Sequence, residues 1–351
     1  MKAIHIGHHF FGAGNLGDDF MLAGFLAAMR PWKDQMRLTC CVPHALEPLR
    51  RRFPEIDWLP YDEPTRRSCI EQCDVWLGLG GSPFQCAVSR WFIDHLIAEA
   101  HQCARAHKPM FFLGVGGQDS AAYALPEVRA VCAQAEIVWP RDADTAEKLS
   151  RALPGGRIRL GADLAHLFFA QHSPPVAAAG RLTAVLNFDY ADWPGLPAAL
   201  AALERLPATE RVWLAQESRR LPGAEQELFD QLPPSAQGRW RLQVADSRAA
   251  TPEESLARWP SGEWLLSARY HATLAGAWAG SRAVVIATNE KLRGAAIDCG
   301  YLTLEPSARE TALAEKLQRS NPPPRTQLAQ FASKARQACV DFAATIGLSA
   351  P

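Results

Sequence analysis

An arginine and a histidine stand two positions apart at the end of an apolar run, where a helical pattern begins. The run covers residues 264–268 and is followed by Arg269 and His271. Arginine carries a permanent charge on a fork that fits a carboxylate or a phosphate, and histidine can transfer a proton near neutral pH. A helix start beside them adds backbone N–H groups that favour an anion. The segment therefore predicts an anion site with a proton donor.

Two further cations follow the next apolar run, residues 283–287, and these are Lys291 and Arg293. The carboxyl ends of parallel strands meet at one sheet edge, where ligands bind, so Lys291 could reach the same anion as Arg269. Lys291 and Arg293 are equally consistent with solvated surface charges. A purely structural Arg269 at a helix start would need an acidic partner. His271 alone would more often be a hydrogen-bonded packing residue, and its place beside Arg269 favours a catalytic role.

Strands and helices must position these residues. The sequence shows short, continuous apolar runs, and segments of helix length separate them. Such runs are typical of parallel strands that are covered on both faces. This alternation of apolar runs and helix-length segments is interrupted at residues 170–180. The stretch is rich in Pro and Ala and predicts a linker. The predicted strands are residues 3–7, 36–42, 74–78, 110–115, 137–139 and 158–161 before it, and 182–188, 211–215, 241–244, 263–266 and 283–287 after it.

Two successive βα repeats predict an α/β protein with two Rossmann-like domains that face each other across a cleft. We expect an N-terminal domain over residues 1–170 and a C-terminal domain over residues 171–351. A final helical stretch, roughly residues 327–346, is a candidate to pack back across the interface. The cleft is the default place for a ligand.

A glycine loop, residues 12–17, satisfies the dinucleotide pattern GxGxxG after the first predicted strand. Three features count against a dinucleotide. Four residues separate the strand from the first glycine, Asp18 and Asp19 put negative charge where a pyrophosphate would lie, and the second predicted strand ends without a ribose-binding acid. The glycines instead let the loop fold close to a ligand, with Asp18 or Asp19 capping the helix that runs to Met29.

Two more glycine loops, residues 78–85 and 114–118, follow predicted strands. One such loop is more often structural than functional, but their recurrence at one edge favours a ligand site that includes Gly80 and Gly81.

Composition narrows the class of partner. Lys plus Arg equal Asp plus Glu at 37 each, so no overall field attracts nucleic acid. The nine cysteines form no CxxC pair, which fits a reducing cytoplasm.

No stretch approaches the roughly 18 apolar residues of a membrane helix, and we expect a soluble, non-exported protein. His5, His8 and His9 suit no standard zinc site, so we expect no metal.

Taken in order, the motifs resemble the polysaccharide pyruvyl transferase family over about residues 4–298. They are GAGNLGDD, LGLGGSPFQ, LGVGG, WPRDADTAEKL and SARYHATLAGAWAGSRAVVIATNEKLRG. The resemblance implies a GT-B-like fold and transfer of pyruvate from phosphoenolpyruvate to two hydroxyls of a sugar. The product would be a pyruvate ketal in a cell-envelope polysaccharide, as in exopolysaccharide biosynthesis.

The same resemblance assigns roles to residues. Arg269 and, as a second anion-binding arginine, Arg141 would hold phosphoenolpyruvate, and His271 would donate the proton. Asn15 and Asp18 would face the acceptor, in a loop lined by Gly14 and by Gly80 and Gly81. The acceptor would be a sugar, an oligosaccharide or a lipid-linked glycan, and a lipid-linked acceptor would bring peripheral membrane association.

The residue types agree with that chemistry. Phosphoenolpyruvate carries a carboxylate and a phosphate, which Arg269 could hold with Lys291 or Arg293 and with Arg141. A histidine acid protonating the vinyl carbon typically contributes about 10² to 10⁴ in rate. The route needs no metal and no cofactor besides phosphoenolpyruvate as co-substrate. Two alternatives stay open: a nucleotide-sugar glycosyltransferase of the same fold, whose donor diphosphate lies at the cationic edge, and a non-catalytic glycan-binding relative.

Overall fold

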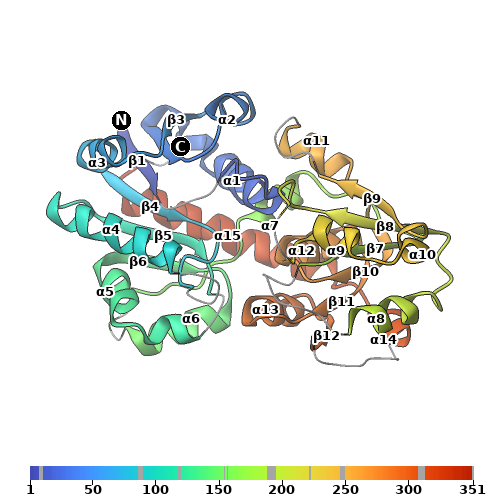
Figure 1. Ribbon diagram of the computed structural model, residues 1–351. Helices are drawn as coiled ribbons and strands as arrows, with labels where there is room; N and C mark the ends of the chain where they lie inside the picture. Colours follow the sequence, from blue (N-terminus) through green and yellow to red (C-terminus); the bar gives the residue numbers. More distant parts are fainter. Residues whose placement is uncertain are drawn as a thin grey trace. The chain divides into compact units, whose positions relative to one another are not determined.

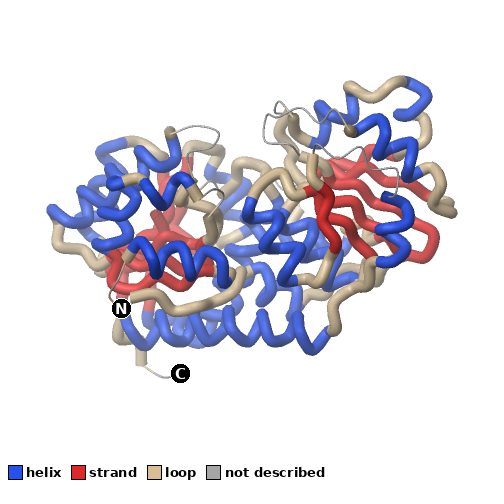
Figure 2. The backbone as a smooth tube through the Cα atoms, turned by 90° about the horizontal axis from the view of Figure 1, so that it is seen from below, coloured by secondary structure: helices blue, strands red, loops and turns tan. Residues whose placement is uncertain are grey.

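The chain folds into two compact units. The computed structural model describes residues 1–7, 11–85, 90–117, 120–153, 155, 157–187, 195–220, 223–245, 250–306 and 313–349. The N-terminal unit comprises residues 1–13, 18–170 and 329–351, and the C-terminal unit comprises residues 14–17 and 171–328. Each unit holds a parallel six-stranded sheet with flanking helices (Figures 1 and 2). The predicted α/β class with two Rossmann-like domains is confirmed.

The N-terminal sheet has the strand order β3-β2-β1-β4-β5-β6. Its strands are β1 (Lys2–Gly7), β2 (Met36–Val42), β3 (Ile56–Pro60), β4 (Val75–Leu79), β5 (Met110–Val115) and β6 (Ala135–Pro140). Its helices are α1 (Leu16–Met29), whose first residues belong to the C-terminal unit, η1 (Arg30–Gln35), α2 (Leu46–Arg52), α3 (Glu63–Gln72), α4 (Trp91–Arg105), η2 (Ala121–Ala124), α5 (Pro126–Gln134), α6 (Ala143–Ala152) and α7 (Ala165–Gln171).

The C-terminal sheet has the order β12-β11-β10-β7-β8-β9. Its strands are β7 (Ala178–Val185), β8 (Glu210–Ala215), β9 (Arg241–Val244), β10 (Gly262–Ser267), β11 (Arg282–Ile286) and β12 (Leu302–Leu304). Its helices are α8 (Leu196–Leu203), α9 (Glu225–Asp230), α10 (Pro234–Gln237), α11 (Pro252–Ala257), α12 (Tyr270–Ala279), α13 (Glu290–Asp298) and α14 (Leu313–Arg319). The last helix, α15 (Arg325–Thr345), begins in this unit and ends in the N-terminal one.

Burial explains why the central strands read as continuous apolar runs. Every residue of β4 and β5 is buried, because helices cover both faces of a parallel sheet. The core of the N-terminal unit includes Trp76 of β4 and Phe112 of β5, whose rings meet edge to face. In the C-terminal unit, Trp213 and Leu266 belong to the corresponding core.

Helix α4 buries Ile93 and Leu96 in the core. Glu99 of the same helix is also buried, and it accepts a hydrogen bond from Trp76 Nε1 at 3.0 Å. Arg66 lies 3.4 Å from the same carboxylate and balances its charge. A buried carboxylate with two partners is therefore compatible with the core.

Two strands of the structure were not predicted, and one predicted strand does not form. The apolar-run criterion missed β3, whose buried and exposed residues largely alternate, and β12, which has only three residues. The run at 158–161 forms no named strand, only an isolated bridge between Ile158 and Val138. Edge positions in a sheet need less apolar sequence than central ones, so they are harder to recognise.

Among the described residues, no helix combines the length and apolar character that a membrane crossing requires.

Candidate functional site

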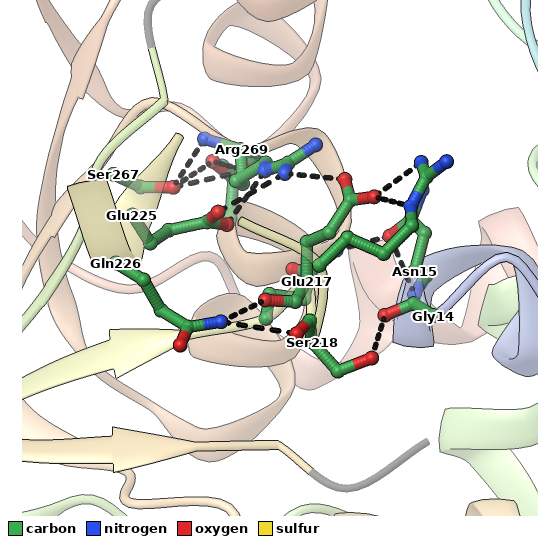
Figure 3. A network of polar contacts seen from close by, with 12 residues as sticks. Gly14, Asn15, Glu217, Ser218, Glu225, Gln226, Ser267 and Arg269 are labelled. Atoms are coloured by element: carbon green, nitrogen blue, oxygen red, sulfur yellow. Dashed lines mark hydrogen bonds and ion pairs between the residues drawn. The ribbon is translucent and has the colours of Figure 1, made fainter. Parts of the chain in front are cut away.

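A cluster of buried carboxylates and an arginine lies at the carboxyl edge of the C-terminal sheet (Figure 3). Arg269 follows β10, Glu217 follows β8 and Glu225 begins α9. Arg269 Nε donates to Glu225 Oε1 at 2.7 Å, and Nη2 donates to Glu225 Oε2 at 3.1 Å. Nη2 also donates to Glu217 Oε2 at 3.0 Å. One edge of the guanidinium thus carries a bidentate pair, the strongest geometry for such a contact.

The cluster is well buried and formally neutral. The side chain of Arg269 is 15% exposed, that of Glu217 is 5% and that of Glu225 is 0%. Arg219 supplies the second positive charge, since its Nε donates to Glu217 Oε1 at 2.6 Å. The charges of the two arginines and the two glutamates cancel. A buried site tolerates ion pairs only when their polar atoms are fully hydrogen-bonded.

Local hydrogen bonds fix the backbone where Arg269 enters α12. The Ser267 hydroxyl donates to the Arg269 carbonyl at 2.9 Å and accepts from the Arg269 N–H at 3.2 Å. The Thr273 hydroxyl, one turn along α12, lies 3.0 Å from the Ser267 hydroxyl. Arg269 is the N-cap residue with extended backbone, and its own side chain does not cap the helix. The first-turn N–H groups of α12 are therefore suited to an anion.

Residues 14–17 from the first glycine loop join this edge. Asn15 forms an antiparallel bridge with Glu217, and Asn15 Oδ1 accepts from Gln216 Nε2 at 3.0 Å. The Ser218 N–H donates to the Gly14 carbonyl at 3.0 Å. Gly14 has φ +104°, and a Cβ there would lie 2.4 Å from the Ser218 hydroxyl, so this loop requires glycine. The acceptor roles predicted for Gly14 and Asn15 stay predictions.

His271 lies in the first turn of α12 and packs against the same loop. A Cβ on Gly17 would lie 2.1 Å from His271 Nδ1, so only glycine lets the loop backbone approach the imidazole this closely. The ring also meets Tyr270 edge to face, with centroids 5.2 Å apart. His271 is 7% exposed. The structure thus brings His271 beside Gly17, in the loop that also holds Asn15, while its catalytic role stays a prediction.

The helix cap of α1 differs from the expected one. Asn15 precedes the helix and its Oδ1 accepts from the Gly17 N–H at 3.1 Å. Asp19 instead forms a buried ion pair with Arg52 at 2.6 Å, and Asp18 lies in the first turn of α1 within the N-terminal unit. Asn caps helices as well as Asp does, so an acidic doublet alone does not identify the cap.

Lys291 and Arg293 both lie in the first turns of α13, in the C-terminal unit. Arg293 donates to both carboxylate oxygens of Glu305, at 2.8 and 2.9 Å, and its side chain is 46% exposed. Lys291 is partly exposed. The N-terminus of α13 is capped by Asn289, whose Oδ1 accepts from the Leu292 N–H at 3.1 Å.

Arg141 belongs to the N-terminal unit. It is buried, lies 3.3 Å from Asp163 and donates to the Ser82 hydroxyl at 3.2 Å. Ser82 follows Gly80 and Gly81, whose φ values of +65° and +71° give them a structural need for glycine. The binding roles of Arg141, Gly80 and Gly81 stay predictions.

Glu217 and Glu225 were not predicted as site residues. Glu217 lies two residues after the end of β8, just as Arg269 lies two residues after the end of β10, and this signal could have identified it. Glu225 lies outside any apolar run, so only the fold brings it to Arg269.

No protein-family model matches the chain, and no curated protein matches it. Solved structures of the same fold cover nearly all of it. The S. aureus MnaA structure with UDP is 12% identical with a TM-score of 0.64, and the two chains are covered at 99% and 98%. The UDP-GlcNAc 2-epimerase of Neisseria meningitidis bound to UDP-GlcNAc is 12% identical with a TM-score of 0.58 and 99% coverage of both chains. HepE of Anabaena with UDP and glucose is 12% identical with a TM-score of 0.57, covering 99% of this chain and 97% of its own.

These findings correct the pyruvyl transferase prediction, with its phosphoenolpyruvate donor, its ketal product and its place in exopolysaccharide biosynthesis. The similar structures named above carry UDP or a UDP-sugar, and no family model supports the resemblance. The geometry adds a physical reason. The bidentate edge of Arg269 holds Glu225, Arg293 holds Glu305, and Arg141 lies in the other unit beside Asp163. These three predicted cations, all arginines, are therefore engaged with protein carboxylates. What the similarity establishes is the GT-B-like fold of two Rossmann-like domains.

Proposed function

We propose that this protein is an enzyme that acts on a nucleoside-diphosphate sugar, with a UDP-sugar as the first candidate. The observation that carries the proposal is the place of the α12 N-terminus, which the Arg269 side chain does not cap, beside His271 and the buried carboxylates of Glu217 and Glu225. Such a helix end binds a diphosphate through backbone N–H groups and the helix dipole, without a free arginine. The UDP and UDP-sugar named with the similar structures support the ligand class.

The neutral cluster favours a sugar next to the diphosphate. Carboxylates accept hydrogen bonds from sugar hydroxyls, and those of Glu217 and Glu225 are held rigidly by Arg269. Carboxylates that are already fixed in place reduce the entropy that is lost when a substrate is oriented. His271 supplies an acid or a base close to neutral pH.

The reaction we propose first is epimerisation at a sugar carbon, because several similar structures are UDP-GlcNAc 2-epimerases. Such a reaction needs a group that removes a proton from carbon and a group that returns one on the other face. Imidazole and carboxylate are the groups that this edge offers. We also place the enzyme in the cytoplasm, since the eight described cysteines are free thiols.

The test is proton NMR of UDP-GlcNAc incubated with the protein in deuterated water. We expect a second UDP-sugar epimer to appear with deuterium at the inverted carbon. His271→Asn should lower turnover by about 10² or more, whereas the exposed His101→Asn should leave it unchanged. Formation of the epimer without deuterium would exclude proton exchange with solvent. Transfer of the sugar to an acceptor with release of UDP would replace epimerisation by glycosyl transfer.

A further inference from the structure

A histidine and two cysteines converge in the N-terminal unit, whereas the residues that carry the proposed function belong to the C-terminal unit. They are His5, Cys41 and Cys69, and one ligating atom from each lies within 4.8 Å of the other two. The two sulfurs are 3.8 Å apart. We propose that these three residues bind a zinc ion.

The fold explains the convergence. His5 on β1 is the register partner of Thr39 on the parallel neighbour β2, and Cys41 lies two residues further along β2. Because side chains alternate along a strand, His5, Thr39 and Cys41 share one face of the sheet. Helix α3, which carries Cys69, packs against both strands. Three separate elements therefore bring their ligands to one point.

The separation of the sulfurs is the one that zinc requires. Zinc binds thiolates at about 2.3 Å in tetrahedral geometry, which places two ligating sulfurs about 3.8 Å apart. A disulfide would need the sulfurs at about 2.05 Å, and Cys41 and Cys69 are free thiols. Two thiolates and one imidazole form a ligand set that suits zinc.

The surroundings support a metal rather than simple packing of thiols. The Thr39 hydroxyl lies 3.0 Å from His5 Nδ1, so it can fix the ring and leave Nε2 as the ligand. A second partner on the other ring nitrogen is the usual arrangement for a metal-binding histidine. Two thiolates also cancel the charge of a divalent cation, which lowers the cost of burying it.

The fourth coordination position belongs to water. His5 and Cys41 are buried, at 1% and 4% exposure, whereas Cys69 is partly exposed. The site therefore meets solvent on the side of α3. Three protein ligands and one water are the arrangement of open zinc sites, which exchange the water for another ligand.

We expected no metal because neither the histidines nor the cysteines show the short spacing of a standard zinc site. Positions 5, 41 and 69 are 36 and 28 residues apart. Only parallel pairing of β1 with β2 and the packing of α3 bring them together, so no linear motif identifies them.

The test is a titration of the reduced, metal-free protein with Co²⁺, followed by competition with Zn²⁺. Cobalt bound by thiolates gives charge-transfer absorption, which we expect to saturate at one equivalent and to disappear when zinc is added. Cys69→Ser should weaken zinc binding by about tenfold or more, because it removes a direct ligand. Cys132→Ala, which removes a buried thiol of α5 outside the cluster, should leave zinc affinity unchanged.

Because Cys69 is partly exposed, the Cys69→Ser variant should keep the wild-type fold. Its circular dichroism spectrum, compared with that of the wild-type protein, checks this. His5→Gln is the second variant. It keeps both thiols and should also lose affinity, which separates this site from binding to thiols alone. Absent cobalt absorption in the wild-type protein, or affinity unchanged in Cys69→Ser, would overturn the proposal. So would a Cys41–Cys69 disulfide that forms in air whether or not zinc is present.

Discussion

At the scale of single residues, Arg269 shows how far residue type predicts chemistry. Its place at the end of an apolar run correctly predicted a strand end followed by a helix start. The sequence could not show that Glu225 and Glu217 hold its guanidinium, because these residues are 44 and 52 positions away. A charged residue found in a sequence is available to a ligand only when no other protein residue pairs with it in the folded structure.

Removing Arg269 should destabilise the protein strongly. Arg269→Met leaves two buried carboxylates without their main partner, and breaking a buried pair in this way typically costs about 3–5 kcal/mol. The exposed pair of Arg293 and Glu305 is the matched control, and Arg293→Met should change the free energy of unfolding by about 1 kcal/mol or less. Urea denaturation measures both. Equal effects of the two substitutions would show that Arg269 is not held as the distances indicate.

At the scale of elements, the sequence located central strands well and connections poorly. β4, β5, β10 and β11 lie within one or two residues of their predicted positions, because a strand covered on both faces must be apolar throughout. β3 and β12 lie at sheet edges, where that requirement weakens. The docking of residues 14–17 on the C-terminal unit depends on the close backbone approaches at Gly14 and Gly17, which no local pattern specifies.

The link between α1 and α2 gives a pH-dependent prediction. Asp19 of α1 and Arg52 of α2 form a buried ion pair, and burial raises the pKa of Asp19 to about 6, against the opposing effect of Arg52. A pKa raised in the folded state means that folding favours the protonated acid. Its contribution to stability is therefore fully present below about pH 3.8 and is lost as the pH rises through about 6.

Asp19→Asn removes this titration, so the wild-type free energy of unfolding should fall relative to that of Asp19→Asn between about pH 4 and pH 6. Urea denaturation of both proteins across this range tests it. A wild-type protein that gains stability over the variant as the pH rises would mean that Arg52, not burial, controls the carboxyl group.

At the scale of the whole molecule, the repeated βα rhythm predicted two Rossmann-like domains, and the structure confirms them. The activity was not predicted, because the glycine loops and the Arg-x-His segment are compatible with more than one anionic ligand. Gly14, Gly17 and Gly80 meet backbone and packing requirements in this fold, so their presence does not specify a substrate. The class of ligand depends on which charged groups can still contact a ligand once the protein has folded.

The most direct measurement is a calorimetric titration of the wild-type protein with UDP and with UDP-GlcNAc, beside phosphoenolpyruvate. We predict saturable binding of one UDP or UDP-GlcNAc per chain, no binding of phosphoenolpyruvate, and weaker UDP binding after a substitution that perturbs the α12 N-terminus, such as Ser267→Ala. Binding of phosphoenolpyruvate with no response to UDP or UDP-GlcNAc would contradict the proposed function.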